Sequence, residues 1–222
     1  MIQSKTDTQQ PGNAVVPYTP ASRITNAFRQ YAIRPEIETA DATGPMDAIE
    51  GQKALLLADV ENLTYSARNL GFKVSYRLLA DKLNRIAGSC KLHAFFSCRE
   101  GDERWSSYFA SRGWIPHPNH IEIVQTYNGV KRLANSDNLM LFSAGLLISR
   151  SIADVIIIAS GDGSMVCDMT KALIKLPKRR KVITMSLAGS TSWRLDAAKN
   201  RYIAHNIEIG RDCLHRDIRW RR

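Results

Sequence analysis

Three aspartates lie at the ends of predicted secondary-structure elements, although they are far apart in the chain. Asp59 follows the apolar run 54–58, Asp162 follows the apolar run 153–159, and Asp137 begins a predicted apolar helix. Carboxylates that converge in a fold repel one another unless a cation or protons compensate their charge. Mg²⁺ and Mn²⁺ prefer oxygen ligands and can activate a bound water against a phosphodiester. We therefore predict that Asp59, Asp137 and Asp162 bind Mg²⁺ or Mn²⁺ in a hydrolytic site.

Two neutral side chains accompany these aspartates. Asn62 lies three residues after Asp59, and Ser160 lies two residues before Asp162. We expect both to act in catalysis by orienting a bound water or a ligand carboxylate. Simpler explanations stay open. Asn62 and Asp137 stand where helices begin and are suited to capping them, and Gly-Asp-Gly is common in ordinary turns.

The elements that must position these residues alternate along the chain. Apolar runs bounded by turn residues predict strands, and apolar residues at helical spacing between them predict helices. Alternating strands and helices predict a parallel sheet with helices on both faces and right-handed crossovers. The carboxyl ends of its strands then share one edge, where open α/β sheets bind ligands. The strands are expected at residues 54–58, 92–98, 121–125, 153–159 and 182–187, with a short edge strand at 207–209.

Local features of this pattern carry more specific expectations. Residues 114–120 contain two prolines and are expected to form an irregular link. The helix over 139–147 is apolar nearly all round, which predicts that it packs inside the layered fold. Gly161 and Gly163 are expected to let the backbone turn sharply on either side of Asp162.

The charge of the chain points to a polyanionic partner. Among 222 residues, Lys and Arg total 31 against 21 Asp and Glu, a net charge of +10. Such a balance favours nucleic acid, although a solvated basic surface without a specific partner would give the same total. The residues expected to contact phosphates are Lys131, Arg132, Lys178, Arg179, Arg180, Lys181 and Arg194.

Composition divides the chain into three parts. Residues 1–48 mix Gln, Thr, Pro, Asn and Ala and are expected to form a partly disordered or loosely docked extension. Residues 49–209 carry the strand and helix pattern, and an apolar fraction of 44% over the chain is enough to fill a core. Residues 210–222 hold five arginines and form a basic tail that is expected to contact phosphates or to be disordered.

The cysteines and the N-terminus indicate the compartment. The four cysteines form no C-x-x-C motif, and two of them fall inside apolar segments, which is typical of a reducing compartment. No apolar stretch resembles a secretory signal or reaches the length of a membrane span. We expect a soluble, cytoplasmic protein. Zinc is not expected at His117 and His120, because no cysteine or carboxylate cluster accompanies them at zinc spacing.

Three motifs together resemble a known family. They are D-V-E-N-L at 59–63, S-D-N at 136–138 and D-V-I-I-I-A-S-G-D-G-S at 154–164. Their order and spacing are similar to those of NYN domains, the LabA-like branch of the PIN-like nucleases, over residues 53–209. The resemblance implies a three-layer αβα sandwich around a mainly parallel sheet, a divalent-metal site and ribonuclease activity. It assigns Asp59 and Asn62 to the first motif, Asp137 to the central acid, and Ser160 and Asp162 to the S-G-D element.

The sequence departs from the family pattern at two positions. Many members carry a second acid in the central helix, about where Ser143 stands, and another just after S-G-D-G, where this chain has Ser164. With two acids fewer, one bound metal ion is expected rather than two. Asn62 and Glu61 could partly make up the loss, although Glu61 could equally point away from the site. Asp154 also matches a frequent Asp, but it begins its strand, far from the site, and is expected to be structural.

These features favour a metal-dependent endoribonuclease that hydrolyses RNA phosphodiester bonds. The alternative is a catalytically weak or inactive NYN-fold module that binds nucleic acid, which Ser143 and Ser164 favour. A phosphatase or phosphotransferase with Asp59 as its nucleophile is a weaker idea, because Glu61 stands where a second aspartate would be needed. The expected partner is RNA, single-stranded or structured, with no membrane; a homodimer is left open.

Overall fold

The computed structural model describes residues 46–127, 129–133, 136–173, 175–176, 178, 180–195 and 202–217. Most of the expected N-terminal extension, Arg179, the side chain of Arg132 and the end of the basic tail lie outside these residues. None of the helices in the described part of the chain combines the length and the apolar composition that crossing a membrane requires.

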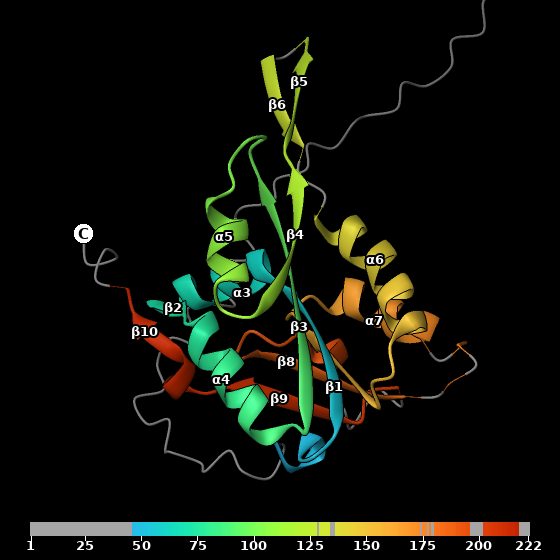
Figure 1. Ribbon diagram of the computed structural model, residues 1–222. Coiled ribbons are helices and arrows are strands. Elements are labelled where there is room, and N and C mark those ends of the chain that lie inside the picture. Colours follow the sequence, from blue (N-terminus) through green and yellow to red (C-terminus); the bar gives the residue numbers. More distant parts are fainter. Residues whose placement is uncertain are drawn as a thin grey trace, which may run out of the picture. The chain divides into compact units, whose positions relative to one another are not determined.

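A six-stranded sheet forms the centre of the fold, and every neighbouring pair of its strands is parallel. The strand order is β4-β3-β1-β7-β8-β9 (Figure 1). The predicted parallel sheet is therefore confirmed. The strands are β1 (Lys53–Asp59), β3 (Ser89–Cys98), β4 (Trp114–His120), β7 (Val155–Ala159), β8 (Lys181–Leu187) and β9 (His205–Ile209).

The sheet reverses its direction of growth between β1 and β7. From β1 the chain adds β3 and then β4 on one side, and it returns to add β7, β8 and β9 on the other. Ligands bind at such a reversal in open α/β sheets, because the loops after the two adjacent strands leave toward opposite faces. In this chain β1 ends at Asp59 and β7 ends immediately before Ser160.

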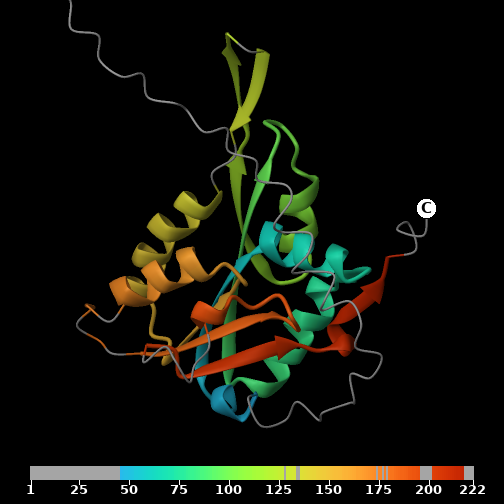
Figure 2. The same cartoon turned by 180° about the vertical axis from the view of Figure 1, so that it is seen from behind.

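Helices cover both faces of the sheet (Figures 1 and 2). Side chains of β1 alternate between the two resulting cores: Leu56 packs in one, and Leu55 and Leu57 pack in the other. Burial on both faces explains why β1 and β7 are nearly continuous apolar runs. The three-layer sandwich is confirmed. One face carries α3 (Val60–Asn69), α4 (Tyr76–Ile86) and α5 (Arg104–Ala110), and the other carries α6 (Ser136–Arg150) and α7 (Gly163–Leu173).

The expectation of an irregular link over residues 114–120 is wrong. These residues form β4, which is the edge strand beside β3. Proline has no backbone N–H, so it is tolerated where one side of a strand has no partner. Pro116 and Pro118 therefore suit this edge position.

The strand expected over residues 121–125 exists, but it does not belong to the main sheet. β5 (Glu122–Thr126) pairs antiparallel with β6 (Gly129–Leu133), and this hairpin projects beyond the carboxyl end of β4 (Figure 1). The side chains of β5 are exposed. A short apolar run fits a buried parallel strand and a hairpin strand equally well, so the sequence pattern alone did not separate them.

Helix α6 is not enclosed by the fold, contrary to the expectation from its apolar composition. Met140, Ala144 and Ile148, spaced one turn apart, are buried against the sheet. Phe142 and Leu146, on another side of the helix, are 74% and 46% exposed. The helix belongs to an outer layer, so only one stripe of it has a protein neighbour to pack against.

The chain after residue 209 contributes to the packed domain. Following η3 (Arg211–Cys213), β10 (Leu214–Arg216) pairs antiparallel with β2 (Phe72–Val74). Cys213 is buried. Near the start of the described chain, η1 (Asp47–Ile49) buries its last residue in the core. The first part of the basic tail is thus built into the fold rather than separate from it.

Candidate active site

Asp59 is the most constrained carboxylate at the carboxyl edge of the sheet. It is 5% exposed, at the end of β1 and at the start of α3. Its Oδ1 accepts the backbone N–H of Asn62 at 3.0 Å, which caps α3. Its Oδ2 accepts the hydroxyl of Ser160 at 3.1 Å, from the far side of the β1–β7 reversal. The carboxylate is therefore fixed by groups from both strands.

Burial raises the pKa of Asp59 from 3.8 to about 6. The hydrogen bonds from Asn62 and Ser160 lower this pKa by less than burial raises it. The carboxylates of Asp137 and Glu61 raise it further. Ionising Asp59 thus places negative charge in a desolvated position beside other acids. A bound cation would stabilise the ionised form.

The S-G-D-G element holds the second carboxylate. Ser160 is fully buried, and its Oγ also accepts the backbone N–H of Asp162 at 3.1 Å. Asp162 Oδ1 accepts the backbone N–H groups of Ser164 at 2.7 Å and Met165 at 3.3 Å, so it caps α7. Within the described residues, Asp162 Oδ2 has no hydrogen-bond partner, so it is the oxygen that remains to bind a ligand.

Asn62 does not cap a helix, so the simpler explanation offered for it is wrong; Asp59 takes that role. The Asn62 side-chain Oδ1 accepts the backbone N–H of Gly161 at 2.8 Å. This bond ties the first turn of α3 to the loop that carries Asp162. Asn62 therefore sets the spacing between the two acidic motifs.

Glu61 and Asp137 bring two further carboxylates to the same edge. Glu61 Oε2 accepts the hydroxyl of Ser136 at 2.5 Å and that of Ser97 at 3.3 Å. Partial burial raises the pKa of Asp137, and the neighbouring carboxylates of Asp162 and Glu61 add to this effect. Asp137 is thus within electrostatic reach of both Asp59 and Asp162, and Ser160 links Asp59 to the backbone of Asp162.

Glu61 was expected only as an acid that could partly replace the missing ones, and the two serines that bind it were not predicted as site residues. Ser97 lies near the end of β3, and Ser136 is the first residue of α6. Through their hydroxyls, Glu61 connects three elements around Asp137. The available signal was the position of Glu61 in the first helical turn after Asp59, which directs its side chain toward the same strand ends.

The chemistry of this donor set suits a hard divalent cation. All its charged ligand atoms are carboxylate oxygens, which Mg²⁺ and Mn²⁺ prefer. Among the residues that the structure describes, however, no three acids, histidines or cysteines lie close enough to hold one ion directly. Mg²⁺ usually keeps several waters and uses one or two carboxylates. The arrangement fits an ion held partly through water.

Some basic residues expected to contact RNA lie at the opposite edge of the sheet. Lys181 begins β8, and Lys178 pairs with Asp154 at 3.4 Å at the amino end of β7. Arg180 donates to two backbone carbonyls of the segment before β7. The length of β7 puts these groups roughly 16 Å from the acidic edge. The structure therefore does not bring them to the site, and Arg179 lies outside the described residues.

Other predicted RNA contacts lie on the carboxyl side of the sheet (Figure 1). Lys131 is exposed on β6 of the hairpin, beside Arg132, whose side chain is not described. Arg194, in η2 (Trp193–Leu195), donates from Nη1 to Ser164 Oγ at 3.2 Å. Ser164 lies in the first turn of α7, which Asp162 caps, so the Arg194 guanidinium lies beside the acidic edge.

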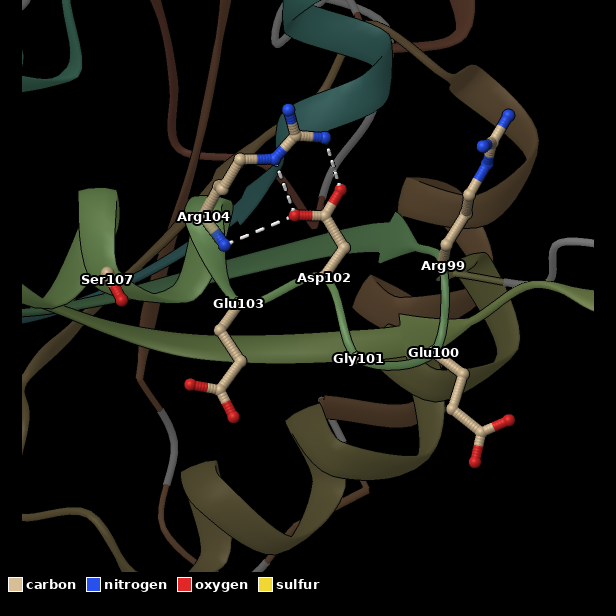
Figure 3. Close-up of a pocket in the computed structure, with 7 residues that line it drawn as sticks. All are labelled: Arg99, Glu100, Gly101, Asp102, Glu103, Arg104 and Ser107. Carbon is tan, nitrogen blue, oxygen red and sulfur yellow. Dashed lines mark hydrogen bonds and ion pairs between the residues drawn. The ribbon is translucent and has the colours of Figure 1, made fainter.

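A hollow of about 640 Å³ lies over the loop between β3 and α5 (Figure 3). Arg104 binds both oxygens of Asp102, at 2.8 and 2.7 Å, while Glu100 and Glu103 point away from this pair. Asp59, Asp137 and Asp162 do not line the hollow. It is therefore separate from the acidic cluster.

Gly161 and Gly163 serve close packing. The chain turns from β7 into α7 over residues 160–162, but neither glycine has a positive φ, so the turn does not depend on their conformational freedom. A β-carbon on Gly161 would lie 2.5 Å from the backbone oxygen of Ser190, and one on Gly163 would collide with the side chain of Ser192. Both glycines are required because the loop after β8 packs directly on the S-G-D-G backbone.

Gly161→Ala is expected to lower the free energy of unfolding by about 1–3 kcal/mol, because the added methyl group meets backbone that cannot rotate away. Urea denaturation measures this change. Gly145→Ala is the matched control: it lies inside α6 with open space around the new β-carbon and should be neutral or stabilising. Equal losses in both variants would contradict the close-packing argument.

Comparison with known proteins agrees with this architecture. Among curated proteins, none is significantly similar to the chain. A crystal structure of a protein of unknown function from Vibrio parahaemolyticus superposes with a TM-score of 0.54 at 19% identity, covering 75% of this chain and 98% of that one. This likeness shows a shared fold. The family model of the NYN domain matches residues 53–208, which include every carboxylate of the acidic edge. The chain therefore belongs to the NYN domain family.

Proposed function

We propose that the protein is a divalent-metal-dependent endoribonuclease. The observation that carries this proposal is the convergence of Asp59, Asp137 and Asp162 at the β1–β7 reversal, with the pKa of Asp59 raised to about 6. Such an edge is unfavourable unless a cation binds it. Membership in the NYN family, whose domains have a PIN-like nuclease fold, supports the same conclusion.

Asp59, Asp137 and Asp162 would hold Mg²⁺ or Mn²⁺. When bound, the ion supplies a Lewis acid and lowers the pKa of a water ligand, which is the chemistry that phosphodiester hydrolysis needs. Ser160 holds Asp59 Oδ2 in position, and Asn62 fixes the distance between the two acidic loops. Glu61 keeps the start of α6 beside Asp59 by accepting the hydroxyl of Ser136.

The proposed substrate contact at the site comes from Arg194 and from Lys131 on the hairpin. Arg132, Lys178, Arg179, Arg180 and Lys181 remain predicted RNA contacts. Those that the structure places at the amino edge would meet only RNA that extends beyond the cleavage site. We further propose that residues 49–209 form the nuclease domain, with 1–48 as its extension and 210–222 as a basic tail whose first part packs on the domain through β10. Four free cysteines fit the cytoplasm as the working compartment.

The proposal is tested by incubating the purified protein with end-labelled single-stranded RNA and Mn²⁺. We expect internal cleavage that EDTA stops and that added Mn²⁺ restores. Asp162→Asn should remove cleavage without unfolding the protein, because asparagine still caps α7. Cleavage that persists both in EDTA and in the variant would refute the proposed site.

A binding module without catalysis is the second candidate. It is favoured by the absence of three directly ligating side chains within the described residues and by Ser143 and Ser164, where many family members have acids. Calorimetry separates the two candidates. A protein that binds RNA more strongly at low salt but takes up no Mn²⁺ would be the binding module.

A further inference from the structure

The turn that carries Trp193 and Arg194 is fixed against the acidic edge. The backbone N–H of Ser192 donates to the carbonyl of Gly161 at 3.2 Å. Leu195, which follows the pair, is fully buried. The β-carbon of Arg194 lies 3.1 Å from the position of a β-carbon on Gly163. The turn η2 is therefore held in a fixed position relative to the S-G-D-G loop.

The two side chains of this turn differ in what they contact. Arg194 reaches Ser164 Oγ, in the first turn of α7, whose backbone N–H binds Asp162. Its guanidinium carbon also lies 5.8 Å from the centre of the Trp193 ring. Trp193 itself is 73% exposed. An exposed aromatic ring thus lies beside a cation that contacts the first turn of α7.

An isolated exposed aromatic residue needs no explanation, but this one lies on a fixed turn, next in sequence to a cation that contacts the first turn of α7. Aromatic side chains stack on nucleic-acid bases, and arginine binds phosphate. Successive nucleotides of one strand present a phosphate and a base in alternation. The Trp193–Arg194 pair matches that alternation. A base can stack on indole only when it is unpaired.

We infer that Trp193 and Arg194 form a clamp for single-stranded RNA, in which Arg194 binds a backbone phosphate at the acidic edge and Trp193 stacks the adjacent unpaired base. This inference rests on the proposed function, because it names the substrate class of the proposed cleavage site. It does not depend on metal, since stacking and phosphate binding need none.

The test measures binding in EDTA, where no cleavage occurs. The probe is a fluorescein-labelled single-stranded oligoribonucleotide of about 12 nucleotides, compared with its duplex by fluorescence anisotropy. Trp193→Ala should raise the Kd for the single strand about 5- to 150-fold and change duplex binding little. Trp193→Phe should restore most of the affinity, because phenylalanine keeps an aromatic face.

Ile152→Ala provides a matched control, since Ile152 is 68% exposed but precedes β7 at the opposite edge. Its Kd should equal that of the unaltered protein. Equal single-strand affinity of Trp193→Ala and the unaltered protein, or equally tight binding of duplex and single strand, would overturn the clamp. If the variant weakens binding but the unaltered protein does not cleave RNA with Mn²⁺, the clamp stands and the proposed nuclease function fails.

Discussion

Asp59→Asn is expected to reduce RNA cleavage about 1,000-fold while making the metal-free protein more stable at pH 7.5. A bound metal ion contributes several kcal/mol to a hydrolytic transition state, and each 1.36 kcal/mol changes the rate tenfold. Asparagine loses the charge that the ion needs. It also removes a buried carboxylate whose pKa is raised to about 6, which should add about 1–3 kcal/mol to the free energy of unfolding.

Opposite effects on activity and stability distinguish this variant from one that merely disturbs the fold. Asparagine is as good a helix cap as aspartate, so α3 keeps its first turn. Cleavage is measured with labelled RNA and Mn²⁺, and stability by urea denaturation in EDTA. Asp154→Asn serves as the control, because Asp154 is half-exposed at the amino edge, where it pairs with Lys178. Lower stability of Asp59→Asn would show that the buried charge is already compensated in the free protein.

The layers of the fold were predictable because strands buried on both faces have a distinctive apolar sequence pattern. β1 and β7 are buried on both faces, so both are continuous apolar runs followed by polar residues. Alternation with helices then implies parallel strands and a shared carboxyl edge. The meeting of Asp59 with Ser160 across the reversal follows from this topology alone.

What could not be predicted depended on contacts between distant segments. The prolines of β4 favour an irregular connection over a strand unless it is already known that the segment lies at the edge of the sheet. The need for Gly161 arises from the loop at Ser190, far along the chain. Glu61 joins the site because serines from β3 and α6 bind it, and nothing near Glu61 in the sequence shows that they do.

The affinity for Mn²⁺ is expected to fall about tenfold between pH 7.5 and pH 5, because protons compete with the ion for Asp59. With a pKa of about 6, Asp59 is about one-tenth ionised at pH 5. Asp137, whose pKa is also raised, adds to the loss. Calorimetric titration with Mn²⁺ at both pH values measures the change. An affinity that is the same at pH 5 and pH 7.5 would exclude Asp59 as a ligand.

The same titration affects stability with a predictable sign. Folded protein holds the Asp59 proton more tightly than unfolded protein, so this group raises the free energy of unfolding as pH falls from 6 toward 4. His93 acts in the opposite direction. Burial, with smaller effects from His117 and Lys91, lowers its pKa to about 4, so the folded state resists protonation below pH 6.5 and loses stability there.

Because these two contributions offset each other, the unaltered protein alone would show little of either. The difference in free energy of unfolding between Asp59→Asn and the unaltered protein isolates the aspartate, since His93 is common to both. In EDTA this difference should be largest at pH 7.5 and shrink toward pH 4. In excess Mn²⁺ at pH 7.5 it should change sign, because the ion binds only the folded protein that retains Asp59. If the difference in free energy of unfolding changes with neither pH nor Mn²⁺, Asp59 contributes to the fold without holding a metal ion.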